Sequence, residues 1–395
     1  MAQREGLMDL VTVQAKDLNE NFEAIREGAS IQIDKPKVIT WFLPIVTHAL
    51  KGGVRTVFAF AEHMSLKYGT MNIFVIYAFN GRDFDSAPLD DSLREHFPGL
   101  DFVIRKFLHG KDRAEDLPHS EIAICTLWTT AYIMLRYNQT LRKFYFMQDY
   151  EPMFYAGGDL YMVIEQTYRL GYSCIANTPG VGNRYLQYSD DMVSFLPGID
   201  DSVFYPDPGQ DVAAAGTTDR PWQIVFYGRP TNARNGFFLG IDILKAVKDR
   251  LGDKVRIVSA GAEWDPAEYG VAGKVENLGL LKRIEEVADL YRASDLGLVF
   301  MATPHPSYQP LEYMACGCVV ATNRNESNSW LLNDENALLL EPIADVAAER
   351  IVNALQDQQG QDRKVRAGLE TIGRLNWDEA FGIIEARLLS NNSPT

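Results

Sequence analysis

The chain has 395 residues, of which 46% are hydrophobic and 23% are charged, as expected for a globular protein with room for two domains. A formal net charge of −15 argues against a protein that holds nucleic acid on a basic surface. It does not exclude an anionic small ligand, because a few Arg and Lys residues can form a local positive pocket. The longest apolar run near the start, VITWFLPIV, has nine residues and is too short to cross a bilayer.

The four cysteines all lie in apolar stretches, at Cys125, Cys174, Cys316 and Cys318. This setting predicts small core residues in a reducing compartment, and we therefore expect a cytoplasmic protein. Cys316 and Cys318 form C-x-C without the second pair that a zinc site needs, so no metal site is predicted there.

An alternation of apolar runs and helical stretches begins after a polar leader at residues 1–36. We expect the leader to be loosely helical and either to cap the first domain or to meet a partner. The strand candidates that follow are KVITWFL, NIFVIYAF, DFVIRKF, EIAICTL, KFYFMQ and YSCIAN. Helices are predicted over 53–67, 128–138 and 158–170. Short apolar strands that alternate with helices predict a parallel sheet covered on both faces.

The stretch 197–221 is rich in Pro, Gly, Asp and Ala and predicts an interdomain linker. The alternation then restarts, with strand candidates QIVFYG, VRIVSAG, DLGLVF, CVVATN and ALLLE. Helices are predicted over 235–250, 283–293, 308–315, 342–356, 361–374 and the closing stretch WDEAFGIIEARLL.

The predicted fold is therefore α/β, with two Rossmann-like doubly wound domains that face a central cleft. We assign residues 37–205, joined by a returning helix at 377–390, to the first domain and residues 206–376 to the second. Ligands of such sheets lie beyond the carboxyl ends of the strands, so residues that directly follow strands are the candidates for a site.

Two places in the first domain meet this criterion. Gly52 and Gly53 open a helix after the first strand, where a glycine pair lets backbone approach a ligand and a helix N-terminus favours an anion. A plain turn is the alternative. Asp149 follows the strand KFYFM and is expected to face the cleft, or else to cap a turn. Glu151 lies two residues further along the chain and is either functional or solvated.

The second domain offers four cations in the segments that follow its strands. Arg229 immediately follows the strand QIVFYG, where a guanidinium can bind a phosphate through two parallel bonds. Arg234 opens the next helix and is either a second phosphate ligand or a surface charge. Lys282 and Arg283 precede a helix, where cations oppose the helix dipole; we expect Lys282 to be kept there for a ligand anion.

The segment PHPSYQPLEYMACGCVVATN at 304–323 reads as loop, helix and strand. Pro304 and Pro306 keep the loop from becoming helical, so that the helix can begin only near Tyr308 with Pro310 in its first turn. The backbone around Ser307 and Tyr308 is expected to cradle an anion, and Glu312 to accept bonds from ligand hydroxyls. The alternative for Glu312 is that it complements the helix dipole.

These residues resemble the retaining nucleotide-sugar glycosyltransferases of family four, which have the GT-B fold. That family has a glycine-rich loop after its first strand, an Arg and a Lys for the donor diphosphate, and an E-x7-E segment whose second Glu binds the ribose. Gly52-Gly53, Arg229, Lys282 and Glu312 match these features in order and spacing. Pro304 stands where most members have the first Glu, which contacts the donor sugar. The last predicted helix is similar to the family's closing helix, which crosses back to the first domain.

The segments FYFMQDYEPMFY, TYRLGYSCIANT and PHPSYQPLE are closer to a subgroup, the rhamnan-synthesis-type rhamnosyltransferases. That resemblance, which spans residues 37 to about 385, implies a hexosyltransferase that moves L-rhamnose from dTDP-rhamnose to a growing polysaccharide. A 6-deoxy sugar accords with a donor site that lacks the usual Glu.

The implied enzyme uses a dTDP-sugar donor, a glycan or lipid-linked glycan acceptor, and no cofactor or metal. Asp149 is its expected catalytic residue, and Gly52, Gly53, Arg229, Arg234, Lys282, Ser307, Tyr308 and Glu312 are its expected donor-binding residues. Peripheral association with the inner face of the membrane and homo-oligomerisation stay open. The alternatives are a sugar-nucleotide epimerase of the same fold and a non-catalytic subunit that binds glycan or nucleotide.

Overall fold

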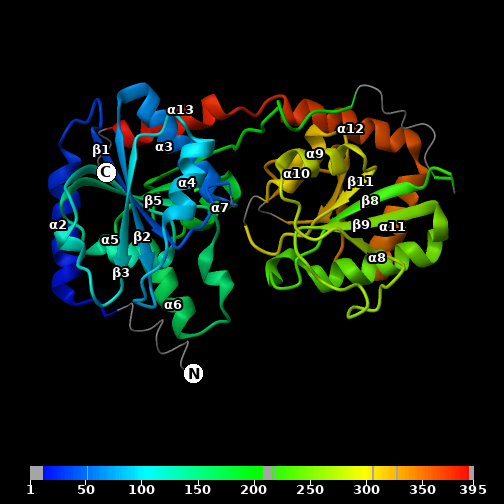
Figure 1. Cartoon of the computed structure of the whole chain (residues 1–395), viewed down its shortest axis with the longest axis horizontal. Coiled ribbons are helices and arrows are strands. Elements are labelled where there is room, and N and C mark those ends of the chain that lie inside the picture. The colour runs from blue at the N-terminus through cyan, green and yellow to red at the C-terminus, as the bar shows by residue number, and fades with distance from the viewer. Residues whose placement is uncertain are drawn as a thin grey trace. The chain divides into compact units, whose positions relative to one another are not determined.

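The chain forms two compact units, one made of Met1–Phe195 with Asp378–Thr395 and the other of Leu196–Trp377 (Figure 1). We call them unit 1 and unit 2. The computed structural model describes residues 12–50, 52–207, 216–217, 219–304, 307–325 and 328–390. Each unit contains one sheet in which all neighbouring strands are parallel. The α/β class and the two-sheet architecture predicted from the alternation are confirmed.

The sheet of unit 1 has the order β3-β2-β1-β4-β5-β6-β7. Its strands are β1 (Val38–Pro44), β2 (Met71–Ala78), β3 (Phe102–Leu108), β4 (Ser120–Cys125), β5 (Thr140–Met147), β6 (Ser173–Asn177) and β7 (Met192–Phe195). The sequence predicted the first six of these. It missed β7 because this edge strand has only four residues, of which a single one is fully buried.

Helices cover both faces of this sheet. They are α2 (Ala15–Ala29), α3 (Val54–Tyr68), α4 (Ala87–His96), α5 (Trp128–Leu135), α6 (Asp159–Gln166), α7 (Pro179–Tyr185) and α13 (Trp377–Leu389). Helices α5, α6 and α7 contribute to one core cluster with the strands. On the other face Phe60 of α3 packs edge-on against Trp41 of β1 and Phe381 of α13.

Helix α2 shows what the described part of the leader does. Its Asn21 side chain donates to the Leu170 carbonyl at 2.9 Å and accepts from the Lys143 ammonium at 2.8 Å. Asn21 is fully buried, and its partners lie on β5 and just before β6, more than a hundred residues away in sequence. The leader therefore caps unit 1 through α2, whereas residues 1–11 lie outside the described residues.

Helix α13 is anchored on unit 1 at both its middle and its end. The Arg142 guanidinium donates to the Leu388 and Ser390 carbonyls at 2.7 and 2.6 Å, which satisfies acceptors that the helix C-terminus leaves open. One turn earlier, the Glu385 carboxylate accepts from Lys67 and Tyr68 of α3 at 2.8 and 2.7 Å. The predicted closing helix is confirmed.

The sheet of unit 2 has the order β10-β9-β8-β11-β12-β13. Its strands are β8 (Trp222–Tyr227), β9 (Val255–Ala260), β10 (Glu276–Asn277), β11 (Leu296–Leu298), β12 (Val319–Asn323) and β13 (Ala337–Leu340). Its helices are α8 (Phe237–Leu251), α9 (Ile284–Arg292), α10 (Gln309–Ala315), α11 (Ala344–Gln356) and α12 (Gln358–Ile372). Core clusters link α8 and α11 to one face of this sheet and α9, α10 and α12 to the other.

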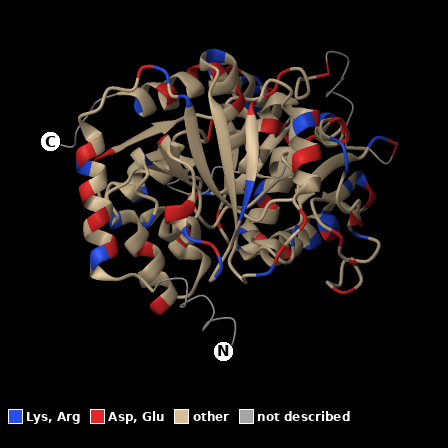
Figure 2. Ribbon diagram, turned by 60° about the vertical axis from the view of Figure 1, so that its left-hand side comes forward, with Lys and Arg blue, Asp and Glu red and all other residues tan. Residues whose placement is uncertain are grey.

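Charged residues lie mainly on helices and loops, while the strands carry few of them (Figure 2). All four cysteines are buried and unbridged, which confirms them as core residues. Within the described ranges, no helix is long and apolar enough to cross a membrane. Residues 197–207 of the expected linker form neither helix nor strand, and residues 208–215 and 218 lie outside the described part.

Candidate functional site

The loops that follow β8, β9 and β10 are joined by backbone hydrogen bonds at the carboxyl end of the unit 2 sheet. Gly228 N donates to the Ala260 carbonyl at 3.1 Å, and Gly261 N donates to the Gly279 carbonyl at 2.9 Å. Gly261 has a φ of 122°, and a Cβ there would press on the ring of Tyr227. Glycine at 261 thus allows the three loops to pack against one another.

Arg229 stands at the start of this group of loops, directly after β8. Its Nη1 donates to the Tyr227 hydroxyl at 3.0 Å, and its guanidinium carbon lies 5.6 Å from the centre of the same ring. These contacts hold the side chain at the carboxyl edge of the sheet. They use one nitrogen of the group, so further donors remain for a bidentate anion.

Lys282 and Arg283 differ in a way that the sequence alone could not show. The Arg283 guanidinium donates to the Glu286 carboxylate at 2.9 Å, and this bond raises the pKa of Arg283. Lys282 is exposed, and among the described residues no carboxylate pairs with its ammonium. Of the two cations, Lys282 is therefore the one that can receive a ligand anion.

The loop after β11 is held by two asparagines at the carboxyl end of β12, one of them the last residue of the strand. Asn323 donates to the Met301 carbonyl and accepts from the Met301 amide, both at 2.8 Å, and Asn325 donates to the same carbonyl at 2.9 Å. Ala302 N donates to the carbonyl of Arg234 at 2.9 Å. Arg234 therefore lies beside the loop that leads to Ser307, although the two are more than seventy residues apart in sequence.

The helix that follows this loop begins where the prolines predicted. Helix α10 starts at Gln309, with Tyr308 as its N-cap and Pro310 in its first turn. Ser307 is buried and donates to the side chain of Gln309. Residues 305 and 306 of the quoted segment lie outside the described residues. Because α10 has only seven residues, its dipole is small, and anion binding there depends on individual backbone N–H groups.

Glu312 lies on α10 near the aromatic side chains that connect it to β8. Burial, the neighbouring Tyr313 and the Glu312 carboxylate raise the pKa of Tyr291, and the phenol of Tyr227 adds to the effect. The carboxylate of Glu312 and the phenol of Tyr227, which binds Arg229, thus both contribute to the raised pKa of the buried Tyr291. Arg229, Arg234, Lys282, Ser307, Tyr308 and Glu312 all lie on segments that leave the carboxyl ends of β8, β10 and β11 in the unit 2 sheet.

Three predicted residues belong to unit 1, at the carboxyl ends of β1 and β5. Gly52 has a φ of 60°, and Gly53 is the N-cap of α3. A Cβ at Gly53 would overlap the side-chain amide of Gln148, the residue before Asp149. Asp149 is buried, and its Oδ1 accepts from the Tyr150 amide at 2.8 Å. Glycine at 53 thus leaves room for the Gln148 side chain, and the pair lies next to Asp149.

Glu151 is not solvated, contrary to the alternative stated above. Its side chain is buried and accepts from the Trp128 amide at 2.6 Å and from the Tyr145 hydroxyl at 3.1 Å. Burial raises the pKa of Glu151 to about 8, although both donors pull it down. The carboxyl group thereby connects the first turn of α5 to the loop after β5, and its role is structural.

Thr178 was missed by the sequence analysis. It follows β6, is fully buried and has a φ of 87°, which is a strained conformation for a β-branched residue. Since β6 neighbours β5, this strained residue lies at the same sheet end as Asp149. The only signal in the sequence was the run TPGVG directly after a strand.

Comparison with known proteins adds to this geometry. Residues 222–356 match the family described as WsaF, C-terminal domain. The chain is 38% identical over 358 residues to the O-antigen biosynthesis protein RfbC of Myxococcus xanthus, a match that covers 90% of this chain and 27% of that protein. The chain thus spans about a quarter of the length of this curated relative.

Solved structures resemble the whole chain at low sequence identity. Anabaena Alr3699/HepE in complex with UDP and glucose superposes with a TM-score of 0.68 at 15% identity, over 90% of this chain and 100% of that one. The sucrose-phosphate synthase of Thermosynechococcus elongatus gives 0.66 at 16% identity, over 88% and 97%. This chain has the GT-B fold. In GT-B terms, the six residues gathered in unit 2 lie on the second Rossmann-like domain, and Gly52, Gly53 and Asp149 on the first.

Among the described residues, no group of three or more His, Cys, Asp and Glu side chains is arranged to hold a metal ion. Cofactor use stays a prediction from the sequence.

Proposed function

We propose that the chain is a retaining glycosyltransferase that moves a 6-deoxyhexose, L-rhamnose, from a dTDP-sugar to a growing polysaccharide. The observation that carries the proposal is the placement of Arg229, Lys282 and Glu312 on segments that leave the carboxyl ends of β8, β10 and β11 in the unit 2 sheet. Similarity to an O-antigen biosynthesis protein supports a polysaccharide product. The UDP and glucose named with the Anabaena structure support a nucleotide-sugar donor.

The proposed chemistry depends on charge at the donor diphosphate. Cleavage of the anomeric C–O bond places negative charge on the leaving diphosphate and positive charge on the sugar. Arg229 and Lys282 stabilise the leaving group through charge-assisted hydrogen bonds, with Arg234 and the backbone near Ser307 and Tyr308 as further ligands. Cationic side chains in this arrangement take the part that a metal ion plays elsewhere.

The remaining residues position the nucleoside and the acceptor. Glu312 binds the ribose hydroxyls, since a half-buried carboxylate is a strong acceptor for two neighbouring hydroxyl groups. Asp149 orients the acceptor hydroxyl or takes its proton, and Gly52 and Gly53 let the loop after β1 approach the donor. Pro304 replaces a Glu that contacts hexoses in similar enzymes, which favours a 6-deoxy sugar.

The acceptor in this proposal is a glycan or lipid-linked glycan. A lipid-linked acceptor would bring a cytoplasmic enzyme to the inner face of the membrane through its substrate.

A transfer assay tests the proposal. The purified chain is incubated with dTDP-L-rhamnose, with and without O-polysaccharide acceptor, and released dTDP and rhamnosylated glycan are measured. We expect release only when acceptor is present, and we expect Arg229→Ala and Lys282→Ala each to slow transfer roughly 100-fold. Donor consumption without acceptor would point to an epimerase instead. Undiminished transfer by both variants would refute the diphosphate assignment.

A further inference from the structure

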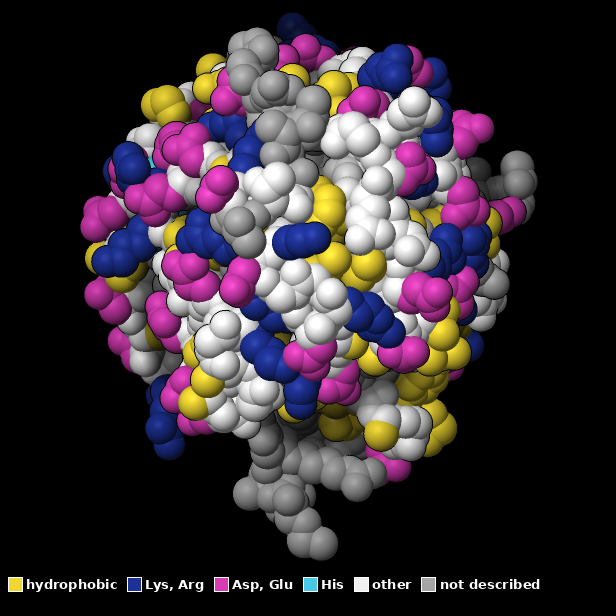
Figure 3. Space-filling view, turned by 90° about the vertical axis from the view of Figure 1, so that its right-hand side faces the viewer, with side chains coloured by type: hydrophobic (Ala, Val, Ile, Leu, Met, Phe, Trp, Pro, Cys, Tyr) yellow, Lys and Arg dark blue, Asp and Glu magenta, His cyan; other side chains and the backbone are white. Residues whose placement is uncertain are grey.

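A cavity of about 550 Å³ lies within unit 2 beside the edge strand β13. The side chains of Leu296, Val319 and Leu338 form its apolar floor, while Arg324, Arg350 and Lys364 supply its cations. Its volume is that of a typical small-molecule site. Figure 3 shows a face of unit 2 on which apolar side chains appear between basic and acidic ones.

The cavity is distinct from the candidate donor site. Leu296 and Val319 are the first residues of β11 and β12, and Asn353 and Ala354 belong to the last turn of α11. These positions mark the amino ends of the strands, whereas Arg324 directly follows the carboxyl end of β12 and its guanidinium reaches Asp334, which precedes β13. The proposed donor ligands follow the carboxyl ends of β8, β10 and β11, and none of them lines the cavity.

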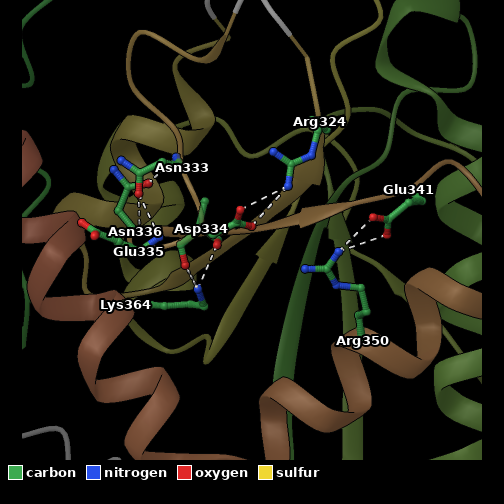
Figure 4. Close-up of polar contacts among 9 residues, drawn as sticks. Arg324, Asn333, Asp334, Glu335, Asn336, Glu341, Arg350 and Lys364 are labelled. Carbon is green, nitrogen blue, oxygen red and sulfur yellow. Dashed lines mark hydrogen bonds and ion pairs between the residues drawn. The ribbon is translucent and has the colours of Figure 1, made fainter.

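The two arginines of the cavity keep donors available for a ligand. Arg350 uses only Nη1, which donates to both Glu341 oxygens at 3.1 Å, and Arg324 uses only Nη2, which donates to Asp334 at 3.2 and 3.4 Å (Figure 4). For the part of the chain that the structure describes, the other guanidinium nitrogens have no protein partner. In Figure 4 the second terminal nitrogen of Arg350 points away from Glu341.

Lys364 adds a third cation at the wall formed by α12. Its ammonium donates to the Asp334 and Ala337 carbonyls at 2.5 and 3.0 Å, which leaves one of its three donors. Asp334 and Asp357 are the acidic side chains of the lining, and Glu341 pairs with Arg350 from beside it, so the three cations meet three carboxylates. The cavity thus offers guanidinium donors above an apolar floor rather than an excess of positive charge.

We propose that this cavity binds a small amphipathic anion, a phosphate or carboxylate group carried on an apolar or aromatic body. The guanidinium nitrogens of Arg324 and Arg350 bind the anion, which such planar groups do through paired hydrogen bonds. The apolar body lies on Leu296, Val319 and Leu338, where it displaces water from a surface that has no polar partner to offer. The site is separate from the donor site and does not depend on the proposed reaction.

Methyl-labelled NMR of the full chain tests the proposal, because the Leu296, Val319 and Leu338 methyl groups report from the cavity floor. The probes are phenyl phosphate and benzoate, which carry both an anion and an aromatic ring. Inorganic phosphate is the control with the anionic group alone, and phenol is the control with the aromatic ring alone. Titrations use the Arg229→Ala/Lys282→Ala variant, so that anions held at the proposed donor site do not contribute.

We expect saturable shifts of the floor methyls with phenyl phosphate, benzoate or both, and roughly tenfold weaker binding of inorganic phosphate and phenol. Arg350→Gln should weaken binding at least about tenfold through loss of a charged hydrogen bond. Ala354→Leu should remove binding by filling the cavity. Arg256→Gln is the matched control, because it breaks a comparable exposed pair with Glu276, 2.7 Å apart, elsewhere in unit 2.

Two results would overturn the proposal. One is the lack of any saturable shift at the floor methyls up to roughly 10 mM of either aromatic anion, far beyond the affinity of a specific site. The other is equal weakening by Arg350→Gln and Arg256→Gln. Because the donor site is disabled in every titration, neither result bears on the proposed transferase.

Discussion

The Glu151 carboxyl group accepts a 2.6 Å hydrogen bond from the backbone N–H of Trp128, at the start of α5. The same group accepts from the Tyr145 hydroxyl on β5. One buried side chain thus satisfies an N–H that a helix start leaves open and fixes the loop that carries Asp149. This contact connects the stability of unit 1 to the geometry of the proposed catalytic residue.

Replacement of Glu151 should destabilise the chain more when the new side chain can accept fewer hydrogen bonds. Glu151→Ala leaves two buried donors without a partner and should lower the free energy of unfolding by about 2–4 kcal/mol. Glu151→Gln keeps one acceptor oxygen and should cost about 1 kcal/mol or less. Chemical denaturation of both variants measures the difference, and equal losses would show that the hydrogen bonds do not matter.

Glu151 should also make stability depend on pH. Its pKa is about 8 in the folded chain and ordinary in the unfolded one, so the folded chain holds a proton that the unfolded chain has released. The stabilisation is complete below pH of about 4.5 and is lost as pH rises toward 8, by at most about 1.4 kcal/mol per pH unit. The wild type should therefore lose stability over this window relative to Glu151→Gln. Parallel pH profiles of the two proteins would contradict the assignment.

Lys282 and Arg283 form a natural pair for testing the diphosphate site. Lys282→Ala removes an exposed ammonium that pairs with no carboxylate among the residues the structure describes, and should weaken nucleotide-diphosphate binding about 10-fold to 100-fold. Arg283→Ala breaks only the pair with Glu286, 2.9 Å apart on the helix surface, and should leave binding unchanged. Titration calorimetry distinguishes them. If Arg283→Ala proves the more damaging change, the two cations have been assigned the wrong way round.

A side chain at position 53 should displace the side chain of Gln148. Gly53→Ala places a methyl group on the Gln148 side-chain amide and should shift the loop beside Asp149, with a roughly tenfold loss of transfer. Gly53→Ala combined with Gln148→Ala should recover much of the loss, since the overlap is gone. Gly157→Ala, where an added Cβ meets nothing within 4 Å, is the control. No rescue in the double variant would mean that Gly53 acts directly on the ligand.

Much of the fold could be predicted because buried parallel strands have sequences that are short apolar runs. The elements that were missed lack this signal. Strand β10 has two residues, β7 has four, and α4 shows only Leu89 and Leu93 as buried apolar positions. Their existence depends on neighbours that are distant in sequence, which no local pattern encodes.

The candidate site could be predicted only in part for a related reason. Arg229 was proposed because it directly follows a strand, and Lys282 because it is a cation at the start of a helix; both are local properties of the sequence. The burial of Glu151, the strain at Thr178 and the overlap that keeps residue 53 a glycine come from tertiary contacts. They become visible only once β5 and β6, and the loops after them, have been placed.

The central claim is that the carboxyl-end loops of unit 2 bind a nucleotide diphosphate, and calorimetric titration of dTDP tests it most directly. We predict saturable binding by the wild type, with an affinity at least about tenfold weaker in Arg229→Ala and in Lys282→Ala and unchanged in Arg283→Ala. Lack of saturable binding by dTDP, UDP and GDP alike, or equal affinity in all four proteins, would contradict the account.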